Sequence, residues 1–215
     1  MNAILATTAP LPSILDLPPP RRSCRRHRIG SFDLDTAALD RFNALLARLG
    51  PRIAPLDCDQ LATAARELRE ATADRCEPPS IEQRVRRIDA AARMIGDPQW
   101  QPAGEAGRTA VLVVGYAGGD RQLLPNSLPT VGRLDEAIVV EAAWPTLEAE
   151  VVSFLDFCRL RAIEAELRGC AVGTFAFTRR DWQQARSAED ALAQHLRSVR
   201  ERSYVPAPTA RFVIH

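Results

Sequence analysis

Apolar residues recur at every third or fourth position along most of the chain between Ser31 and Ser203. This spacing is typical of helices that bury one face. In residues 31–51 a stripe of leucines and one phenylalanine runs up to Gly50-Pro51, a pair that ends helices. Similar stripes occupy residues 57–75, 80–96, 134–169 and 179–203. The pattern therefore predicts an all-α protein, a single helical domain of about six or seven helices.

Two short segments do not follow this pattern clearly. TAVLVVGYAGG, from Thr109 to Gly119, is rich in β-branched residues but has a length that suits either a strand or a short buried helix. AVGTFAFT, residues 171–178, alternates partly like a strand but has no evident partner strand. Pro145 either kinks the helix that begins at Leu134 or starts a new one.

Prolines, charge clusters and capping residues predict where the helices and the domain begin and end. Residues 1–30 are expected to form a disordered arm, because three consecutive prolines and the arginine-rich RRSCRRHR do not support a packed helix. Ser80, with Gln83 three residues later, predicts a capping box at the start of a helix. The helical domain is then expected over residues 31–204, with a C-terminal tail over 205–215.

The arm concentrates positive charge. Its basic residues are Arg21, Arg22, Arg25, Arg26 and Arg28. Such a cluster is either a solvated linker or a contact for RNA, an acidic partner or anionic lipid. No aromatic residues alternate with these arginines, so the stacking of bases is not supported.

Composition narrows the class of protein. The 215 residues are 46% hydrophobic and 26% charged, with a net charge of +1, so no overall field favours nucleic acid. Five scattered cysteines without C-x-x-C spacing give no zinc signature and fit a reducing compartment such as the cytoplasm. No apolar run reaches the roughly 18 residues of a membrane-spanning helix.

The most distinctive stretch is LLPNSLPTVGRLDE, which ends at Glu136 directly before a strongly apolar run. Pro125 and Pro129 disfavour helix in the residues that precede them. Gly132 permits either a positive φ or a close approach of backbone. Asp135 and Glu136 fall in the first turn of the next helix, where negative charge opposes the helix dipole. We predict a structural turn inside a helical hairpin, with Asp135 capping or charge-stabilising the second helix.

The same stretch resembles the YkvA-like family, small bacterial helical proteins built around a domain of unknown function. The family signature is a tyrosine, then D-L-I-P-D, I-P and G-x-L-D-D before an apolar helix. The matching residues are Tyr116, Leu123, Leu124, Pro125, Leu128, Pro129, Gly132, Leu134 and Asp135. The match runs from Tyr116 to about Ala143, within a core of about 108–168. The resemblance implies a helical hairpin, often membrane-associated in other members, and brings no established activity.

The sequence departs from this signature at acidic positions. Gln122 and Asn126 stand where the signature has the two aspartates of D-L-I-P-D, and Glu136 replaces its final aspartate. Two carboxylates have therefore become neutral amides. Asn126 and Ser127 are expected to bond free backbone groups in the turn.

No catalytic constellation stands out. The chain has neither the nucleophile elbow G-x-S-x-G nor a phosphate-binding P-loop. We therefore expect a non-enzymatic helical module that binds a partner protein or itself, without a metal, a cofactor or specific nucleic acid. One alternative is peripheral association with an anionic inner-membrane surface through the arginine cluster and the apolar hairpin of residues 109–144. The other is a carboxylate- or metal-dependent enzyme, for which the candidate residues are Asp120, Asp135, Glu136, Glu141 and Glu148.

Overall fold

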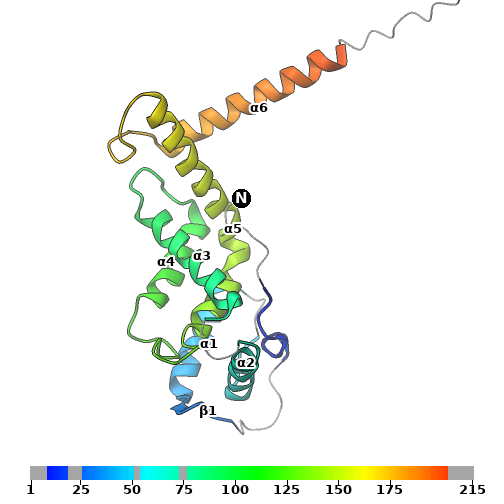
Figure 1. Cartoon of the computed structure of the whole chain (residues 1–215), viewed down its shortest axis with the longest axis vertical. Helices are drawn as coiled ribbons and strands as arrows, with labels where there is room; N and C mark the ends of the chain where they lie inside the picture. The colour runs from blue at the N-terminus through cyan, green and yellow to red at the C-terminus, as the bar shows by residue number, and fades with distance from the viewer. Residues whose placement is uncertain (1–8, 19–25, 51–53, 73–76, 203–215) are drawn as a thin grey trace, which may run out of the picture. The chain divides into compact units, whose positions relative to one another are not determined.

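The computed structural model describes residues 9–18, 26–50, 54–72 and 77–202. As predicted from the periodicity, the fold is all-α, with six α-helices in these residues and one small antiparallel hairpin (Figure 1). The chain divides into two compact units, residues 1–156 and 157–215, called here the first and second units.

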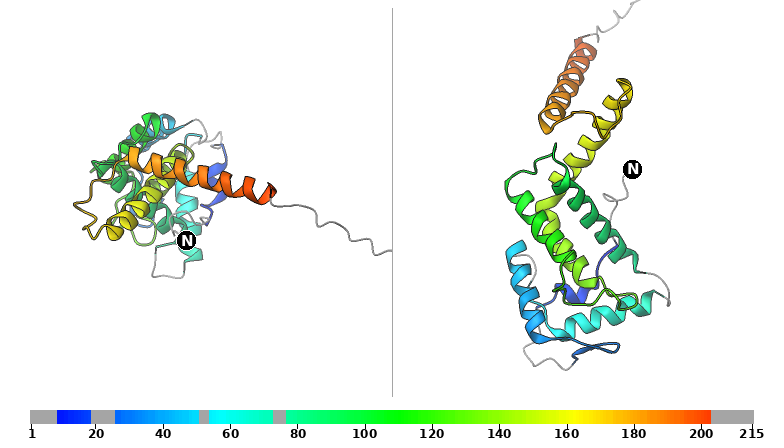
Figure 2. Two further views of the ribbon diagram at one scale, coloured as in Figure 1. Left: turned by 90° about the horizontal axis from the view of Figure 1, so that it is seen from above. Right: turned by 90° about the vertical axis from the view of Figure 1, so that its left-hand side faces the viewer.

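The elements follow one another in a simple order. They are η2 (Ser13–Asp16), β1 (Arg28–Ile29), β2 (Phe32–Asp33), α1 (Thr36–Leu49), α2 (Cys58–Ala71), α3 (Pro79–Gly96), α4 (Gly104–Ala117), α5 (Leu134–Leu167) and α6 (Arg179–Arg202). In the first unit, α3 packs against α4, and α2 packs against both η2 and β1 (Figures 1 and 2).

Aspartates start the first two helices. Both carboxylate oxygens of Asp35 accept hydrogen bonds at the start of α1, from the N–H groups of Ala37 and Ala38 at 3.1 and 3.2 Å. At the start of α2, the N–H of Gln60 donates to Asp57 Oδ1 at 2.8 Å, and the N–H of Asp57 donates to Gln60 Oε1 at 2.9 Å. This reciprocal pair is a capping box, which bonds backbone groups that a helix start leaves free.

The capping box predicted from Ser80 and Gln83 is wrong. Helix α3 already begins at Pro79, with Pro78 before it and no side-chain cap. Ser80 is a buried residue inside the helix, and Gln83 Oε1 accepts from the N–H of Ala9 at 3.0 Å instead. Proline suits the first helical position because its missing N–H would be unpaired there. The helix therefore starts one residue before the serine.

The predicted disordered arm does not hold for residues 9–18 and 26–30, which pack against helices. The side-chain amide of Gln60 donates to the carbonyls of Ile14 and Leu17 at 3.1 and 2.6 Å, and so fastens η2 to α2. The pattern did not reveal this segment, because η2 is too short to show a period. Residues 1–8 and 19–25 of the predicted arm lie outside the described residues.

The hairpin of β1 and β2 is the second ordered part of the predicted arm. Arg28 pairs with Asp33 and Ile29 with Phe32 in antiparallel register. The Ile29 side chain is buried, which gives this short hairpin an apolar anchor. The backbone N–H of Arg26 donates to a carboxylate oxygen of α2, Asp59 Oδ1, at 2.6 Å.

The structure shows the conformation of both segments that the sequence left open between helix and strand. Residues 109–117 belong to α4, which begins at Gly104 and buries Thr109, Ala110 and Val113 on one face. Residues 171–178 form a turn and irregular backbone, neither helix nor strand. Pro145 lies inside α5, which continues through it, so no new helix begins there.

The core of the first unit is formed by apolar side chains from all its helices. Its fully buried large members are Phe42, Leu46, Leu61, Ile81, Met94, Trp100, Leu124, Leu134, Ile138 and Phe154. The Trp100 and Phe154 rings pack with their centroids 5.8 Å apart. The stripes predicted from the sequence for α1, α2, α3 and the start of α5 all contribute to this core.

The second unit has a small aromatic cluster. The Phe177 ring stacks on those of Phe157 and Phe175, at centroid distances of 5.6 and 6.1 Å. The guanidinium groups of Arg161 and Arg168 lie 4.8 and 5.0 Å from the centroids of Phe157 and Phe175. These cation–π contacts place one guanidinium group over each of the two rings.

Candidate functional site

The connection between α4 and α5, residues 118–133, is here called the connecting loop. It is not helical, and yet Leu123 and Leu124 within it are buried as deeply as core residues. Their backbone N–H groups therefore need partners inside the protein.

Asp135 supplies those partners. Its Oδ2 atom accepts from the N–H groups of Leu123 and Leu124 at 3.0 and 3.1 Å and from the Tyr116 hydroxyl at 2.5 Å. The Tyr116 hydroxyl in turn accepts from the N–H of Leu123 at 2.9 Å. One carboxylate oxygen thus joins the end of α4, the connecting loop and the start of α5.

Burial changes the acidity of both side chains. Asp135 is 0% exposed, and this burial raises the pKa of its carboxyl despite the hydrogen bonds from Tyr116 and the Leu124 backbone. Burial, followed by the nearby Asp135, also raises the pKa of the Tyr116 hydroxyl, which therefore stays protonated and donates. Among the described residues, Asp135 Oδ1 has no hydrogen-bond partner, which makes the charged form more costly.

The expected capping role of Asp135 is therefore only partly right. Asp135 lies in the first turn of α5, where its charge opposes the helix dipole. Its side chain, however, bonds the connecting loop that comes before the helix. Asn126 and Ser127, expected to bond the turn backbone, are exposed at the surface of the loop.

Gln122 and Glu136 form a second link across the hairpin. The Gln122 side-chain amide donates to the carbonyl of Ala117 at 2.7 Å and to Glu136 Oε1 at 3.0 Å. Arg133 Nε donates to Glu136 Oε2 at 2.8 Å. Both oxygens of the 1% exposed Glu136 carboxylate are thus bonded. An amide at position 122 suits this arrangement because it can donate to a buried carboxylate, whereas an ionised aspartate would repel it.

Close packing of the loop backbone leaves no room for a side chain at position 132, so this position requires glycine. A side-chain carbon there would lie 2.7 Å from the carbonyl oxygen of Asn126 and 2.9 Å from that of Leu128. Of the two reasons predicted for this glycine, close backbone approach is correct. Gly132 is not among the residues with positive φ, whereas Thr130 in the same loop has φ of 71°, an unusual value for a β-branched residue.

The candidate carboxylates do not share a site. Asp135 and Glu136 are buried and bonded, whereas Asp120, Glu141 and Glu148 are exposed. Glu141 pairs with buried Arg84, whose Nε donates to Glu141 Oε2 at 2.8 Å. Within residues 9–18, 26–50, 54–72 and 77–202, no group of three or more His, Cys, Asp or Glu side chains could hold a metal ion.

Two described arginines of the predicted basic arm, Arg26 and Arg28, line a cavity together with Arg66 and Arg69 of α2. Arg21, Arg22 and Arg25 lie outside the described residues. Sequence reasoning missed the arginines of α2, because only the fold brings them next to the arm. They follow helical spacing on an exposed face, which by itself resembles any solvated helix surface.

Helix α6 presents an apolar stripe to solvent, here called the α6 stripe. It consists of Leu192, Leu196 and Val199, which are 59%, 54% and 43% exposed. The periodicity correctly predicted a helix here but implied that these residues would be buried. Between residues 187 and 201, every residue except Ser198 is exposed.

Searches against known proteins add no assignment. No helix in the described part of the chain has the length and apolar character needed to cross a membrane. The chain matches no family model, no curated protein and no solved structure. The resemblance to the YkvA-like family therefore stays a prediction from the motif residues.

Proposed function

We propose that this chain is a non-enzymatic helical module that pairs, through the α6 stripe, with the same stripe of a second copy. The observation that carries this proposal is the exposure of Leu192, Leu196 and Val199 on one face of a helix. Their spacings of four and three residues align them along the helix.

The stability of α6 supports a partner. Most of the stability of a helix in a protein comes from packing of its amphipathic face, and α6 leaves its apolar stripe exposed. An ion pair on its surface, between Arg186 and Glu189, adds only a few tenths of a kcal/mol. Burial of the α6 stripe against a second helix would supply the missing stabilisation, at roughly 25 cal/mol per Å² of apolar surface.

Charge favours an antiparallel arrangement of two copies. Glu189 and Arg200 lie close to three turns apart, so they occupy the same edge of the α6 stripe. In an antiparallel pair, each edge of the stripe lies beside the same edge of the stripe on the second copy. A pair centred between Gln194 and His195 then places Glu189 of each copy beside Arg200 of the other.

A parallel pair lacks this match. The edge with Glu189 and Arg200 would then meet the opposite edge of the second helix, where Gln184 and His195 lie and no acid faces Arg200. Exposed ion pairs are worth about 0.2–1 kcal/mol each, so they select the orientation, while the apolar side chains supply the affinity.

The experiment measures association by sedimentation equilibrium. Leu192→Glu combined with Leu196→Glu is expected to weaken pairing at least about tenfold, because two charges would enter an apolar contact. Leu167→Glu is the control, since Leu167 is an even more exposed leucine of the second unit outside the stripe. A wild-type chain that stays monomeric over the whole concentration range contradicts the proposal.

A charge swap tests the orientation. Glu189→Arg is expected to weaken pairing, and adding Arg200→Glu is expected to restore it. If the double variant pairs no better than the single one, the antiparallel arrangement is wrong.

We further propose that the connecting loop is a divergent YkvA-like motif with a structural role. Contact between Tyr116 and Asp135, which stand at the two ends of the matched signature, supports this proposal. Among the described residues no disulfide joins Cys58, Cys158 and Cys170, which is in keeping with a cytoplasmic location.

A further inference from the structure

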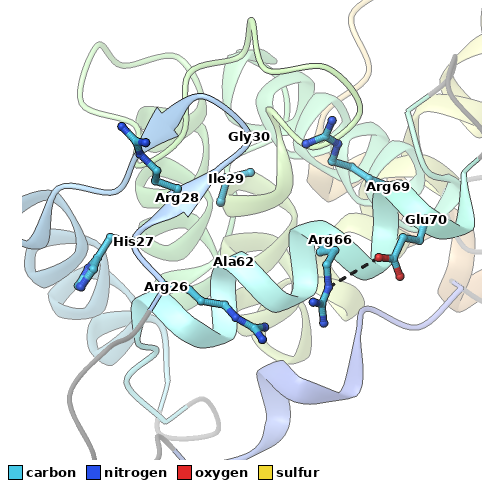
Figure 3. Close-up of a pocket in the computed structure, with 9 residues that line it drawn as sticks. All are labelled: Arg26, His27, Arg28, Ile29, Gly30, Ala62, Arg66, Arg69 and Glu70. Atoms are coloured by element: carbon cyan, nitrogen blue, oxygen red, sulfur yellow. Dashed lines mark ion pairs between the residues drawn. The ribbon is translucent and has the colours of Figure 1, made fainter.

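A cavity of about 580 Å³ lies between the β1–β2 hairpin and α2 in the first unit (Figure 3). The lining residues are Arg26, His27, Arg28, Ile29 and Gly30 from the hairpin segment and Ala62, Arg66, Arg69 and Glu70 from α2. The lining thus contains four arginines but only one acidic residue, a glutamate. This site is independent of α6 and goes beyond the function proposed above.

The arginines differ in how far acids already neutralise them. Arg28 is bound by Asp33 through two hydrogen bonds, Nε to Oδ1 and Nη2 to Oδ2. Arg66 is only loosely paired, with its Nε 3.7 Å from Glu70 Oε1. This leaves Arg66 able to turn toward an anion at little cost.

Two arginines are not paired with an acid. Arg26 Nη1 donates to the hydroxyl oxygen of Thr63 at 3.2 Å, a neutral partner. Arg69 reaches over the hairpin turn, where a side-chain carbon on Gly30 would lie 3.3 Å from its Nη1 atom. Within the described part of the chain, neither guanidinium forms an ion pair, so the positive charge around the cavity is in excess.

The cavity also has an apolar floor. Ile29 and Ala62 are 3% and 8% exposed at its base, between the charged side chains. Its volume falls within the range of roughly 300–1,000 Å³ that is typical of small-molecule sites and exceeds the needs of a lone inorganic ion. A ligand that fits has both an anionic group and an organic part.

We propose that this cavity binds the phosphate group of an organic phosphate, held by Arg26, Arg66 and Arg69. Guanidinium groups bind phosphate through paired N–H donors, and they keep their charge at any physiological pH. The organic part of the ligand rests on Ile29 and Ala62. The described lining contains no Phe, Tyr or Trp, and its one ring side chain is that of His27.

The phosphate has two sources with the same chemistry, a free metabolite or the headgroup of an anionic lipid. Calorimetry with glycerol 3-phosphate tests the first source, and pyrophosphate, which has no organic part, serves as the comparison. Co-sedimentation with phosphatidylglycerol vesicles tests the second. Both use the full-length chain at low ionic strength, where exposed charges are least screened.

The variant Arg26→Gln/Arg69→Gln removes the two arginines without acidic partners. The control is Arg93→Gln/Arg41→Gln, which removes the same charge from exposed positions outside the cavity. Saturable binding by the wild type and the control, weakened at least about tenfold in the cavity variant, supports the proposal. Binding of the free phosphates identifies a metabolite site, and binding of vesicles alone identifies a headgroup site.

Two results overturn the proposal. One is the absence of binding in both assays. The other is equal loss in the cavity and control variants, which would show that net charge alone attracts phosphate. The variant Arg69→Lys adds a check on geometry. It keeps the charge but loses the planar fork, and is expected to bind more weakly than wild type and more tightly than Arg69→Gln.

Discussion

The starts of α5 and α6 have the same sequence feature in opposite surroundings. Each helix carries an aspartate in its first turn, Asp135 in α5 and Asp181 in α6. Asp135 is fully buried and bonds the connecting loop. Asp181 lies near the surface, where its Oδ2 accepts from the N–H and hydroxyl of Thr178 at 2.8 and 2.7 Å.

The comparison shows that an acid early in a helix does not have a fixed role. Asp181 closes a local capping box with Thr178 and depends on no distant residue. Asp135 joins Tyr116, 19 positions earlier, to the backbone of the buried loop. The first arrangement defines the end of one helix, and the second defines how two helices connect.

Removal of the two carboxylates should separate these roles most strongly. Asp135→Ala is expected to lower the free energy of unfolding by about 2–4 kcal/mol, because it leaves the N–H of Leu124 and the hydroxyl of Tyr116 without an acceptor and removes one of the two acceptors of the Leu123 N–H. Asp181→Ala should cost only about 0.5–1 kcal/mol, the usual effect of losing a cap. Urea denaturation measures both, and equal losses would contradict the difference in roles.

Glycine substitutions test whether the connecting loop is as tightly packed as its hydrogen bonds suggest. Gly132→Ala is expected to destabilise the protein by about 1–3 kcal/mol, because the added carbon overlaps two carbonyl oxygens. Gly115→Ala in α4 is the matched control. A side chain there meets no atom within 4 Å, and alanine favours helix by about 0.5–1 kcal/mol. Thermal melts of the two variants should move in opposite directions.

The smallest expected effect is the dependence on pH, which has opposite signs at the two aspartates. Burial raises the pKa of Asp135 above its ordinary value of 3.8, so its contribution to stability declines as the pH rises from that value to the folded pKa. Hydrogen bonds from Thr178 lower the pKa of Asp181, so its contribution is present above 3.8 and is lost as the pH falls through the folded pKa.

Unfolding free energies of Asp135→Asn and Asp181→Asn, each compared with wild type from pH 3 to pH 7, measure these two slopes. The difference for Asp135 should decrease with rising pH at values above about 4. The difference for Asp181 should decrease with falling pH at values below about 4. Parallel slopes would show that the two carboxyls have similar surroundings after all.

The sequence predicts the helices well, because a helix that buries one face has apolar residues at every third or fourth position, a pattern visible within a short segment. It also identifies the connecting loop through Pro125, Pro129 and Gly132. The loop's hydrogen bonds could not be predicted in detail, since the approach of Tyr116 to Asp135 depends on how α4 and α5 pack. The capping box of α6 had a local signal, Thr178 followed three residues later by Asp181, and could have been found.

Other errors arise where distant residues decide the outcome. The segment around η2 has too few residues to show a period, and Gln60 fastens it from α2. The α6 stripe has the period of a buried face, but periodicity does not reveal whether a partner covers it. The cavity arginines of α2 are likewise ordinary surface residues until the hairpin lies beside them.

The hydrogen bonds of Arg84 constrain the order in which parts of the chain can pack during synthesis. This buried side chain donates from Nη1 to the carbonyls of Ala9 and Ser80, both at 2.8 Å, and from Nε to Glu141. During synthesis, the segment at Ala9 leaves the ribosome before its partners in α3, Gln83 and Arg84, so it can dock against them only once α3 has emerged. Contacts between such distant positions form slowly, because the intervening chain must first be closed into a loop. A nascent chain that is interrupted before α3 should therefore remain open to proteases around Ala9, and become more resistant once α3 has emerged.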